Sequence, residues 1–263
     1  MFTGLTLAAL LAAGTTATEV LRFGMDTRGI PGSWVPGLED RREDSRQPPQ
    51  VTRAQLQKLQ GVEVDILKAL AVRLGVRPEI VPTSWFDLEK NLVEERYDLI
   101  LGSWTPNPRT PAAIAASIPY YDWGLMAAVR ADSAVRTLAD LEGRRVGHIP
   151  DPSVETALRA MRASLGAEFV ELKDGDALFD QVAEGTLEAM LFDSMYVRWR
   201  ASRDRTFRII SEPLNRLGYH VGVPRRNQAL LERVDTAIRQ LLDAGEIARV
   251  REKWEGAQKA PVR

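Results

Sequence analysis

Alternation of strand-like and helix-like segments is the feature of this sequence that most limits its possible folds. Short apolar runs at residues 20–25, 77–82 and 97–101 have the composition of strands, and segments with apolar residues at helical spacing lie between them, at 62–74 and 87–95. Alternation of this kind builds a largely parallel sheet flanked by helices. The sequence therefore predicts an α/β fold.

A second series of the same kind begins after Tyr121. Its expected strands are residues 125–129, 144–149, 168–172, 188–192 and 207–210, and its expected helices are residues 153–165, 176–184 and 193–203. The chain then returns through a strand at 219–223 and ends in two amphipathic helices, at 228–242 and 245–254. Residues 37–60, rich in charge, Pro and Gln, predict an exposed loop with one short helix.

Composition removes several kinds of site from consideration. The chain has no cysteine, which excludes disulfides, thiol nucleophiles and zinc–thiolate sites. Lys and Arg total 35 against 36 Asp and Glu, so no excess of positive charge favours nucleic acid. The two histidines, His148 and His220, lie in apolar strands, where structural roles are commoner. We therefore expect no metal, no cofactor and no nucleic-acid partner.

The first 17 residues, MFTGLTLAALLAAGTTA, have the pattern of a secretory signal peptide. They carry no charged side chain, and their apolar part at residues 5–13 is too short to span a bilayer, which takes about 20 residues. Small residues follow where a signal peptidase would cut. The alternative is a buried N-terminal helix. Export without an anchoring Cys predicts a soluble periplasmic protein rather than a lipoprotein.

Loops at the carboxyl ends of the strands are the expected place for a ligand, because open α/β sheets bind ligands there. These loops are residues 26–34, 102–109 and 150–153, together with Asp193 and Ser194. The loop at 102–109 combines hydroxyl groups, an indole and the guanidinium of Arg109, whose fork of donors matches a carboxylate. The alternative for Arg109 is a solvated loop arginine.

Two aspartates in these loops have both a structural and a functional interpretation. Asp193 follows an apolar strand and suits the N-cap of the helix at 194–203, or it faces a ligand ammonium. Asp151, followed by Pro152 and Ser153, suits a helix start, or the helix N-terminus there holds an anion.

A series of motifs in order over residues 20–256 resembles one known family. The motifs are LRFGMD, GVEVDILKALAVRLG, SWFDLEKNLVEERYDLILGSWTPNPR, PYY, LADLEGRRVG, GTLEAMLFDS, YHVGVPRRN and EKWEG. They are similar to those of the bacterial extracellular solute-binding proteins of family 3, which include the periplasmic amino-acid-binding components of ABC importers.

The resemblance implies a two-lobed fold, the periplasmic-binding-protein-like II fold, with a mostly parallel sheet flanked by helices in each lobe. Two hinge strands, near residues 125–129 and 218–223, would join the lobes. Lobe one would comprise residues 18–121 and 218–263, and lobe two residues 122–217. The lobes would close on a small ligand, an amino acid or related zwitterion, and deliver it as a monomer to an ABC permease.

The resemblance also implies roles for individual residues. Arg109 falls on the arginine that grips the ligand carboxylate, and Asp193 on the acid that meets its amino group. Thr105 and Ser103 fall on its hydroxyl and backbone partners, and Asp26 near a first-loop aspartate. Trp34 or Trp104 would cover the apolar part of the ligand.

Departures from the family pattern bear on the ligand. Pro150, Asp151, Pro152 and Ser153 replace the usual Gly-Thr or Gly-Ser at the start of a lobe-two helix, which places a carboxylate where a ligand anion would find backbone donors. Such a change would repel a plain amino acid or attract a cationic ligand. Two rival functions stay open: a periplasmic enzyme on the same fold, similar to cyclic-acid dehydratases, and a ligand-sensing partner of another periplasmic or membrane protein.

Overall fold

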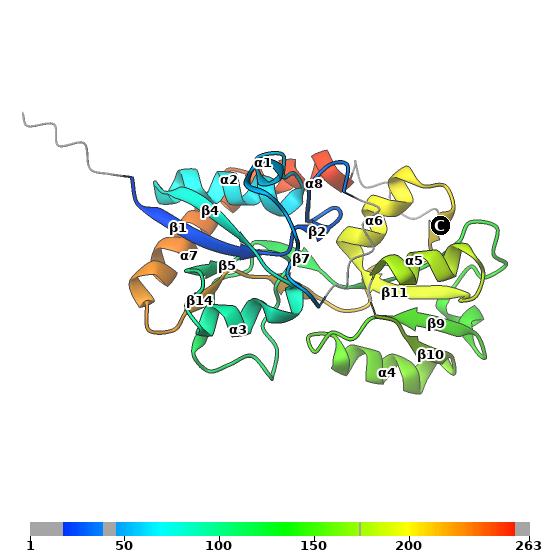
Figure 1. Cartoon of the computed structure of the whole chain (residues 1–263). Coiled ribbons are helices and arrows are strands. Elements are labelled where there is room, and N and C mark those ends of the chain that lie inside the picture. Colours follow the sequence, from blue (N-terminus) through cyan, green and yellow to red (C-terminus); the bar gives the residue numbers. More distant parts are fainter. Residues whose placement is uncertain (1–17, 39–45, 174, 256–263) are drawn as a thin grey trace, which may run out of the picture.

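Two five-stranded sheets organise the chain, one in each half of the molecule (Figure 1). The computed structural model describes residues 18–38, 46–173 and 175–255. The predicted signal peptide at 1–17 lies outside the described residues. Across those described ranges, no helix has the length and apolar character needed to cross a bilayer.

The first sheet has the strand order β4-β1-β5-β14-β6. Its strands are β1 (Val20–Met25), β4 (Arg77–Pro82), β5 (Leu99–Ile100), β6 (Ile114–Ala116) and β14 (Gly222–Pro224). β4, β1 and β5 run parallel, whereas β14 is antiparallel to both of its neighbours. The last part of the chain thus completes a sheet begun by the first.

Helices cover both faces of this sheet, as the apolar spacing predicts. The helices are α2 (Val62–Leu74), α3 (Leu88–Val93) and α7 (Gln228–Asp243), and one 3₁₀ turn, η1 (Trp85–Asp87), precedes α3. α2 ends where predicted, because Gly75 adopts φ +69° in the left-handed region that closes a helix. The short helix expected within 37–60 is α1 (Arg53–Leu56), capped by Thr52. The part of that loop at 39–45 lies outside the described residues.

The second sheet has the order β10-β9-β11-β8-β12. Its strands are β8 (Leu125–Arg130), β9 (Arg145–His148), β10 (Glu168–Glu171), β11 (Ala189–Asp193) and β12 (Phe207–Ile209). Its helices are α4 (Glu155–Leu165), α5 (Gly175–Ala183), α6 (Ser194–Arg203) and the 3₁₀ turn η2 (Leu138–Leu141). Every residue of β11 is buried, because helices lie on both faces of the sheet.

Two antiparallel strands, β7 (Tyr121–Trp123) and β13 (Leu217–Tyr219), connect the halves. The rings of Tyr121 and Trp123 both stack on Tyr219. The linking segment expected at 125–129 lies instead inside the second sheet, because β8 pairs with β11 and β12. The strand expected at 219–223 divides into β13 and β14, since the chain passes there from the connection into the first sheet.

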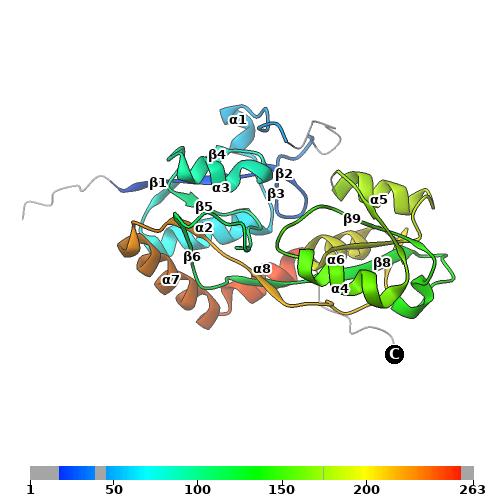
Figure 2. The same cartoon turned by 90° about the horizontal axis from the view of Figure 1, so that it is seen from below.

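One further helix lies beside both halves. α8 (Glu246–Glu255) packs on α2 and α7 of the first half and on α6 of the second (Figure 2). Its Trp254 lies edge-on to Trp34, with ring centroids 5.3 Å apart, and Trp34 also contacts Trp199 of α6. The division into lobes at 121/122 and 217/218 stays a prediction; all strands of the second sheet fall between those two points.

Candidate ligand-binding cleft

A cavity of about 290 Å³ lies between the two halves, where strands of both sheets end. The first half lines it with the hairpin β2 (Arg28–Gly29) and β3 (Ser33–Trp34), with Trp85 and Phe86, and with Gly102 and Ser103. The second half contributes residues 149–151, the start of α5, the end of β11 and Tyr196, and the connection contributes Trp123. A volume of this size suits a small polar molecule.

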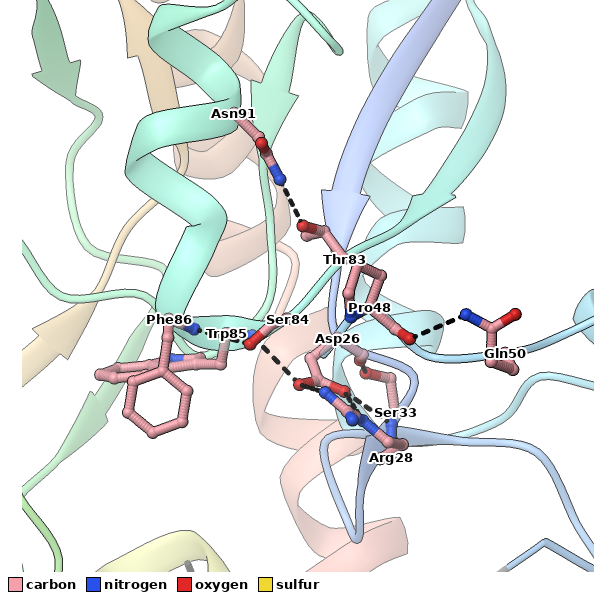
Figure 3. A network of polar contacts seen from close by, with 10 residues as sticks. All are labelled: Asp26, Arg28, Ser33, Pro48, Gln50, Thr83, Ser84, Trp85, Phe86 and Asn91. Carbon is pink, nitrogen blue, oxygen red and sulfur yellow. Dashed lines mark hydrogen bonds and ion pairs between the residues drawn. The ribbon is translucent and has the colours of Figure 1, made fainter. Parts of the chain in front are cut away.

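Asp26 holds the hairpin on the first-half side of the cavity (Figure 3). Arg28 pairs with its carboxylate through two nitrogens, Nε at 3.1 Å from Oδ1 and Nη2 at 2.9 Å from Oδ2. The backbone N–H of Trp85 donates to Oδ2 at 3.1 Å, and Ser33 donates to the Asp26 carbonyl. The carboxylate is thus engaged within the protein, where it positions Arg28 and Trp85.

Ser103 is hydrogen-bonded to a buried glutamate, Glu63. Ser103 has φ +53°, and both its N–H and its hydroxyl donate to Oε1 of Glu63, at 3.0 and 3.1 Å. Tyr120 donates to the other oxygen at 2.7 Å. Burial raises the pKa of Glu63 to about 7, and the hydrogen bonds from Tyr120 and Ser103 offset part of that rise. The Ser103 N–H therefore points to Glu63 rather than to a ligand.

Tyr196, in the first turn of α6, crosses the cleft to the first half. A Cβ atom at Gly29 or Gly32 would lie 2.9 or 3.2 Å from its hydroxyl oxygen, so the two glycines make room for it. The same hydroxyl is hydrogen-bonded to Ser103. Tyr196 thus ties the two halves together beside the cavity.

Asp193 ends β11 and is 8% exposed. Its Oδ1 accepts from the N–H of Met195 at 2.9 Å, which caps α6, and its Oδ2 accepts from the Tyr219 hydroxyl. Burial raises its pKa to about 7, and the charges of Asp151 and Glu63 add to that rise. The predicted capping role is present, while contact with a ligand ammonium stays a prediction.

Asp151 lies in the turn that leads into α4 and lines the cavity. Its Oδ1 accepts from the Ser153 N–H at 2.8 Å, and its carbonyl accepts from the Val154 N–H at 3.1 Å. Burial raises the pKa of this carboxyl. The protein's own carboxylate therefore occupies one donor before this helix, the Ser153 N–H.

Five of the residues singled out from the sequence do not line the cavity. Arg109 is at the surface, with its side chain 68% exposed and its Nη2 2.6 Å from Oε2 of Glu155 in the second half. Ser153 contributes only its N–H, to Asp151. The other three are the buried Thr105, Trp104 and Trp34.

Those three buried residues support the fold around the cavity. Thr105 donates to the Gly218 carbonyl and accepts from the Trp123 indole, which braces the connection between the halves. The Trp104 indole donates to Glu89. Aromatic cover of the ligand by Trp34 or Trp104 stays a prediction. The aromatic side chains that line the cavity are Trp85, Phe86, Trp123, Phe179, Phe192 and Tyr196.

Several cavity residues were not singled out from the sequence. Trp85 and Phe86 follow the carboxyl end of β4, so the rule that selected the other loops would have found them. Arg28 lies inside a loop that was selected. No sequence pattern predicts that Tyr196 lines the cavity, because only the folded structure brings it close to the hairpin. Among the described residues, no cluster of three or more His, Asp or Glu is placed to hold a metal ion.

The profile of the bacterial extracellular solute-binding proteins, family 3, matches residues 43–257. The chain belongs to this family. The L-cystine-binding protein TcyJ of Escherichia coli (strain K12) is 27% identical over 203 residues, 76% of each chain. A cyclohexadienyl dehydratase of Pseudomonas aeruginosa is 28% identical over 141 residues, 52% of each.

A solved structure confirms the predicted fold. The crystal structure of the ancestral amino acid-binding protein AncCDT-1, a precursor of cyclohexadienyl dehydratase, superimposes with a TM-score of 0.70. It is 22% identical and covers 89% of this chain and 94% of its own. The chain thus has the two-lobed α/β fold.

Proposed function

We propose that this solute-binding protein captures a small polar ligand of the amino-acid class, or a close relative of it, between its two halves. It would then deliver the ligand, as a periplasmic monomer, to an ABC importer. One observation carries the proposal: a cavity of ligand size is lined from both sheets, beside a connection of only two strands. Relatives such as TcyJ, an L-cystine-binding protein, support it.

Ligand capture is tested by screening amino acids, amines and small carboxylates for thermal stabilisation. A true ligand stabilises the folded state by about 2.7 kcal/mol at a hundredfold excess over Kd. If the halves close on it, small-angle scattering at saturating ligand should also show a smaller radius of gyration. The absence of any stabilising ligand across the three classes would refute the proposal.

A second candidate function rests on Asp193. Its carboxyl lines the cavity with a pKa raised to about 7 by burial, so protonated and ionised forms coexist near neutral pH, and the protonated form is suited to general-acid catalysis. The dehydratase relative shows that catalysis occurs in proteins similar to this one. Incubation with a cyclohexadienyl acid separates the two functions: we expect no product, and product formation would establish the enzyme.

Arg109 gripping a ligand carboxylate stays a prediction, which a pair of variants tests. In the present geometry its partner is Glu155, and an exposed ion pair contributes about 1 kcal/mol or less. We therefore expect Arg109→Ala and Glu155→Gln to change ligand affinity alike, by less than about fivefold. Calorimetry with an acidic ligand decides: a loss of tenfold or more for Arg109→Ala alone would place Arg109 on the ligand.

A further inference from the structure

Negative charge dominates the cavity wall. Among the described residues, five aspartates line it, against two cationic side chains, Arg28 and Lys173. Arg28 is paired with Asp26, and Lys173 also has a partner. Two of the remaining aspartates, Asp176 and Asp180, are likewise engaged. Asp151 and Asp193 are left as the carboxyl groups whose charge the wall does not balance.

Within the part of the chain that the structure describes, these two carboxyls have no cation within ion-pair distance. Asp151 accepts from one backbone N–H, and Asp193 accepts from one backbone N–H and the Tyr219 hydroxyl. Arg198 influences Asp193 only over a longer range. The charge of Asp151 also adds to the rise in the pKa of Asp193. Such carboxyls lose solvation without gaining a counter-ion, and a ligand cation between them would supply it.

Three donors that the sequence predicts beside a ligand are already engaged within the protein. The Ser153 N–H, at the start of α4, donates to Asp151, and the Ser103 N–H donates to Glu63. The guanidinium of Arg109 lies outside the cavity, on Glu155. These three donors are thus occupied by protein carboxylates, whereas Asp151 and Asp193 offer oxygen acceptors for a cation.

We propose that the ligand is an organic amine or guanidine without an α-carboxylate, and that its cationic group lies between Asp151 and Asp193. In this assignment Asp151 determines specificity, because it occupies the helix start where a ligand carboxylate would otherwise bind. Trp85, Phe86, Trp123 and Phe192 cover the carbon chain. The inference rests on the proposed function and deepens it.

Matched pairs of compounds that differ only by a carboxylate test the ligand class. We would titrate the full chain by calorimetry with agmatine and L-arginine, cadaverine and L-lysine, and putrescine and L-ornithine. In at least one pair the amine should bind at least tenfold more tightly than the amino acid. Tighter binding of the amino acid in every pair that binds would overturn the inference and leave the proposed function standing. No binding in any pair would also overturn it, and the wider ligand screen would then decide the proposed function separately.

A substitution at Asp151 tests the residue itself. Asp151→Asn keeps an oxygen that can accept from the Ser153 N–H but removes the charge. It should weaken amine binding at least tenfold and leave the matched amino acid unchanged or more tightly bound. The control is Asp132→Asn, the same change at an exposed second-half position paired with Arg130, which should alter neither. Equal weakening of both ligands by Asp151→Asn, in a variant with wild-type melting temperature, would mean that Asp151 only shapes the helix start and would overturn the assignment.

Discussion

Replacing Asp193 with asparagine is expected to weaken binding of an amine ligand about a hundredfold and to stabilise the empty protein at alkaline pH. A charge-assisted hydrogen bond to a desolvated group is worth about 1.5 to 3 kcal/mol, which corresponds to roughly ten- to more than a hundredfold in affinity. Asparagine keeps an oxygen that can accept from the Met195 N–H, so the cap of α6 should survive. Calorimetry measures the loss of affinity. The substitution should weaken the binding of a ligand that lacks the amino group far less.

The effect on stability has a definite direction with pH. Burial, with smaller effects of Asp151 and Glu63, raises the pKa of Asp193 from 3.8 to about 7, against the opposing hydrogen bonds from Tyr219 and Met195. Between about pH 4 and 7 the folded protein therefore retains a proton that the unfolded chain releases. The contribution of Asp193 to stability is present below that range and falls as pH rises through it. The remaining neighbours, Tyr196 and Arg198, carry the same charge throughout this range.

Thermal unfolding of the empty protein checks that direction. The melting temperature of Asp193→Asn, relative to wild type, should be higher at pH 8 than at pH 5 by several degrees, since one pKa unit corresponds to about 1.4 kcal/mol. Comparison with wild type at each pH cancels the contributions of His148 and His220. Asp132→Asn, at an exposed site, should show no such increase. If the melting temperatures of variant and wild type differ equally at pH 5 and pH 8, the raised pKa of Asp193 is contradicted.

Gly61→Ala should destabilise the protein by about 3 kcal/mol and abolish ligand binding. Gly61 has φ +138°, and a Cβ atom there would lie 2.1 Å from the Gly32 carbonyl oxygen, a backbone atom that no side-chain rotation can move. The carbonyls of Pro31 and Gly32 accept from the N–H groups of Val62 and Glu63, at the start of α2. A methyl group at position 61 would push the cavity-lining hairpin away from that helix, which adds steric overlap to backbone strain.

Gly75→Ala is the matched control. Gly75 also has a positive φ, +69°, but no atom lies within 4 Å of a Cβ added there. It should cost about 1 kcal/mol, the strain of the left-handed conformation, without affecting ligand binding. Denaturant unfolding and calorimetry of both variants compare the two effects. Similar losses of stability and of ligand affinity in the two variants would show that the hairpin tolerates the methyl group added at Gly61.

Secondary structure was largely predictable because its determinants are local. The apolar spacing of α2 and the glycine after it, the apolar runs of β8 and β11, and the amphipathic α7 all lie within single segments. Positions at the carboxyl ends of strands were predictable for the same reason. Asp151 and Asp193 were selected in this way, and both line the cavity. The α/β class and the loops that meet at the cleft therefore followed from the order of residues alone.

Tertiary structure alone decided where the long side chains point. Arg109 turns outward because its N–H bonds the Asn107 side chain within a loop that contains Pro106 and Pro108, and Glu155 is brought to it from the other half of the molecule. Trp34 packs on Trp199 and Trp254 because α6 and α8 converge there, although they lie more than 150 residues further along the chain. Hydrogen-bond partners and burial arise only when such distant segments pack together. That packing also leaves the charges of Asp151 and Asp193 unbalanced.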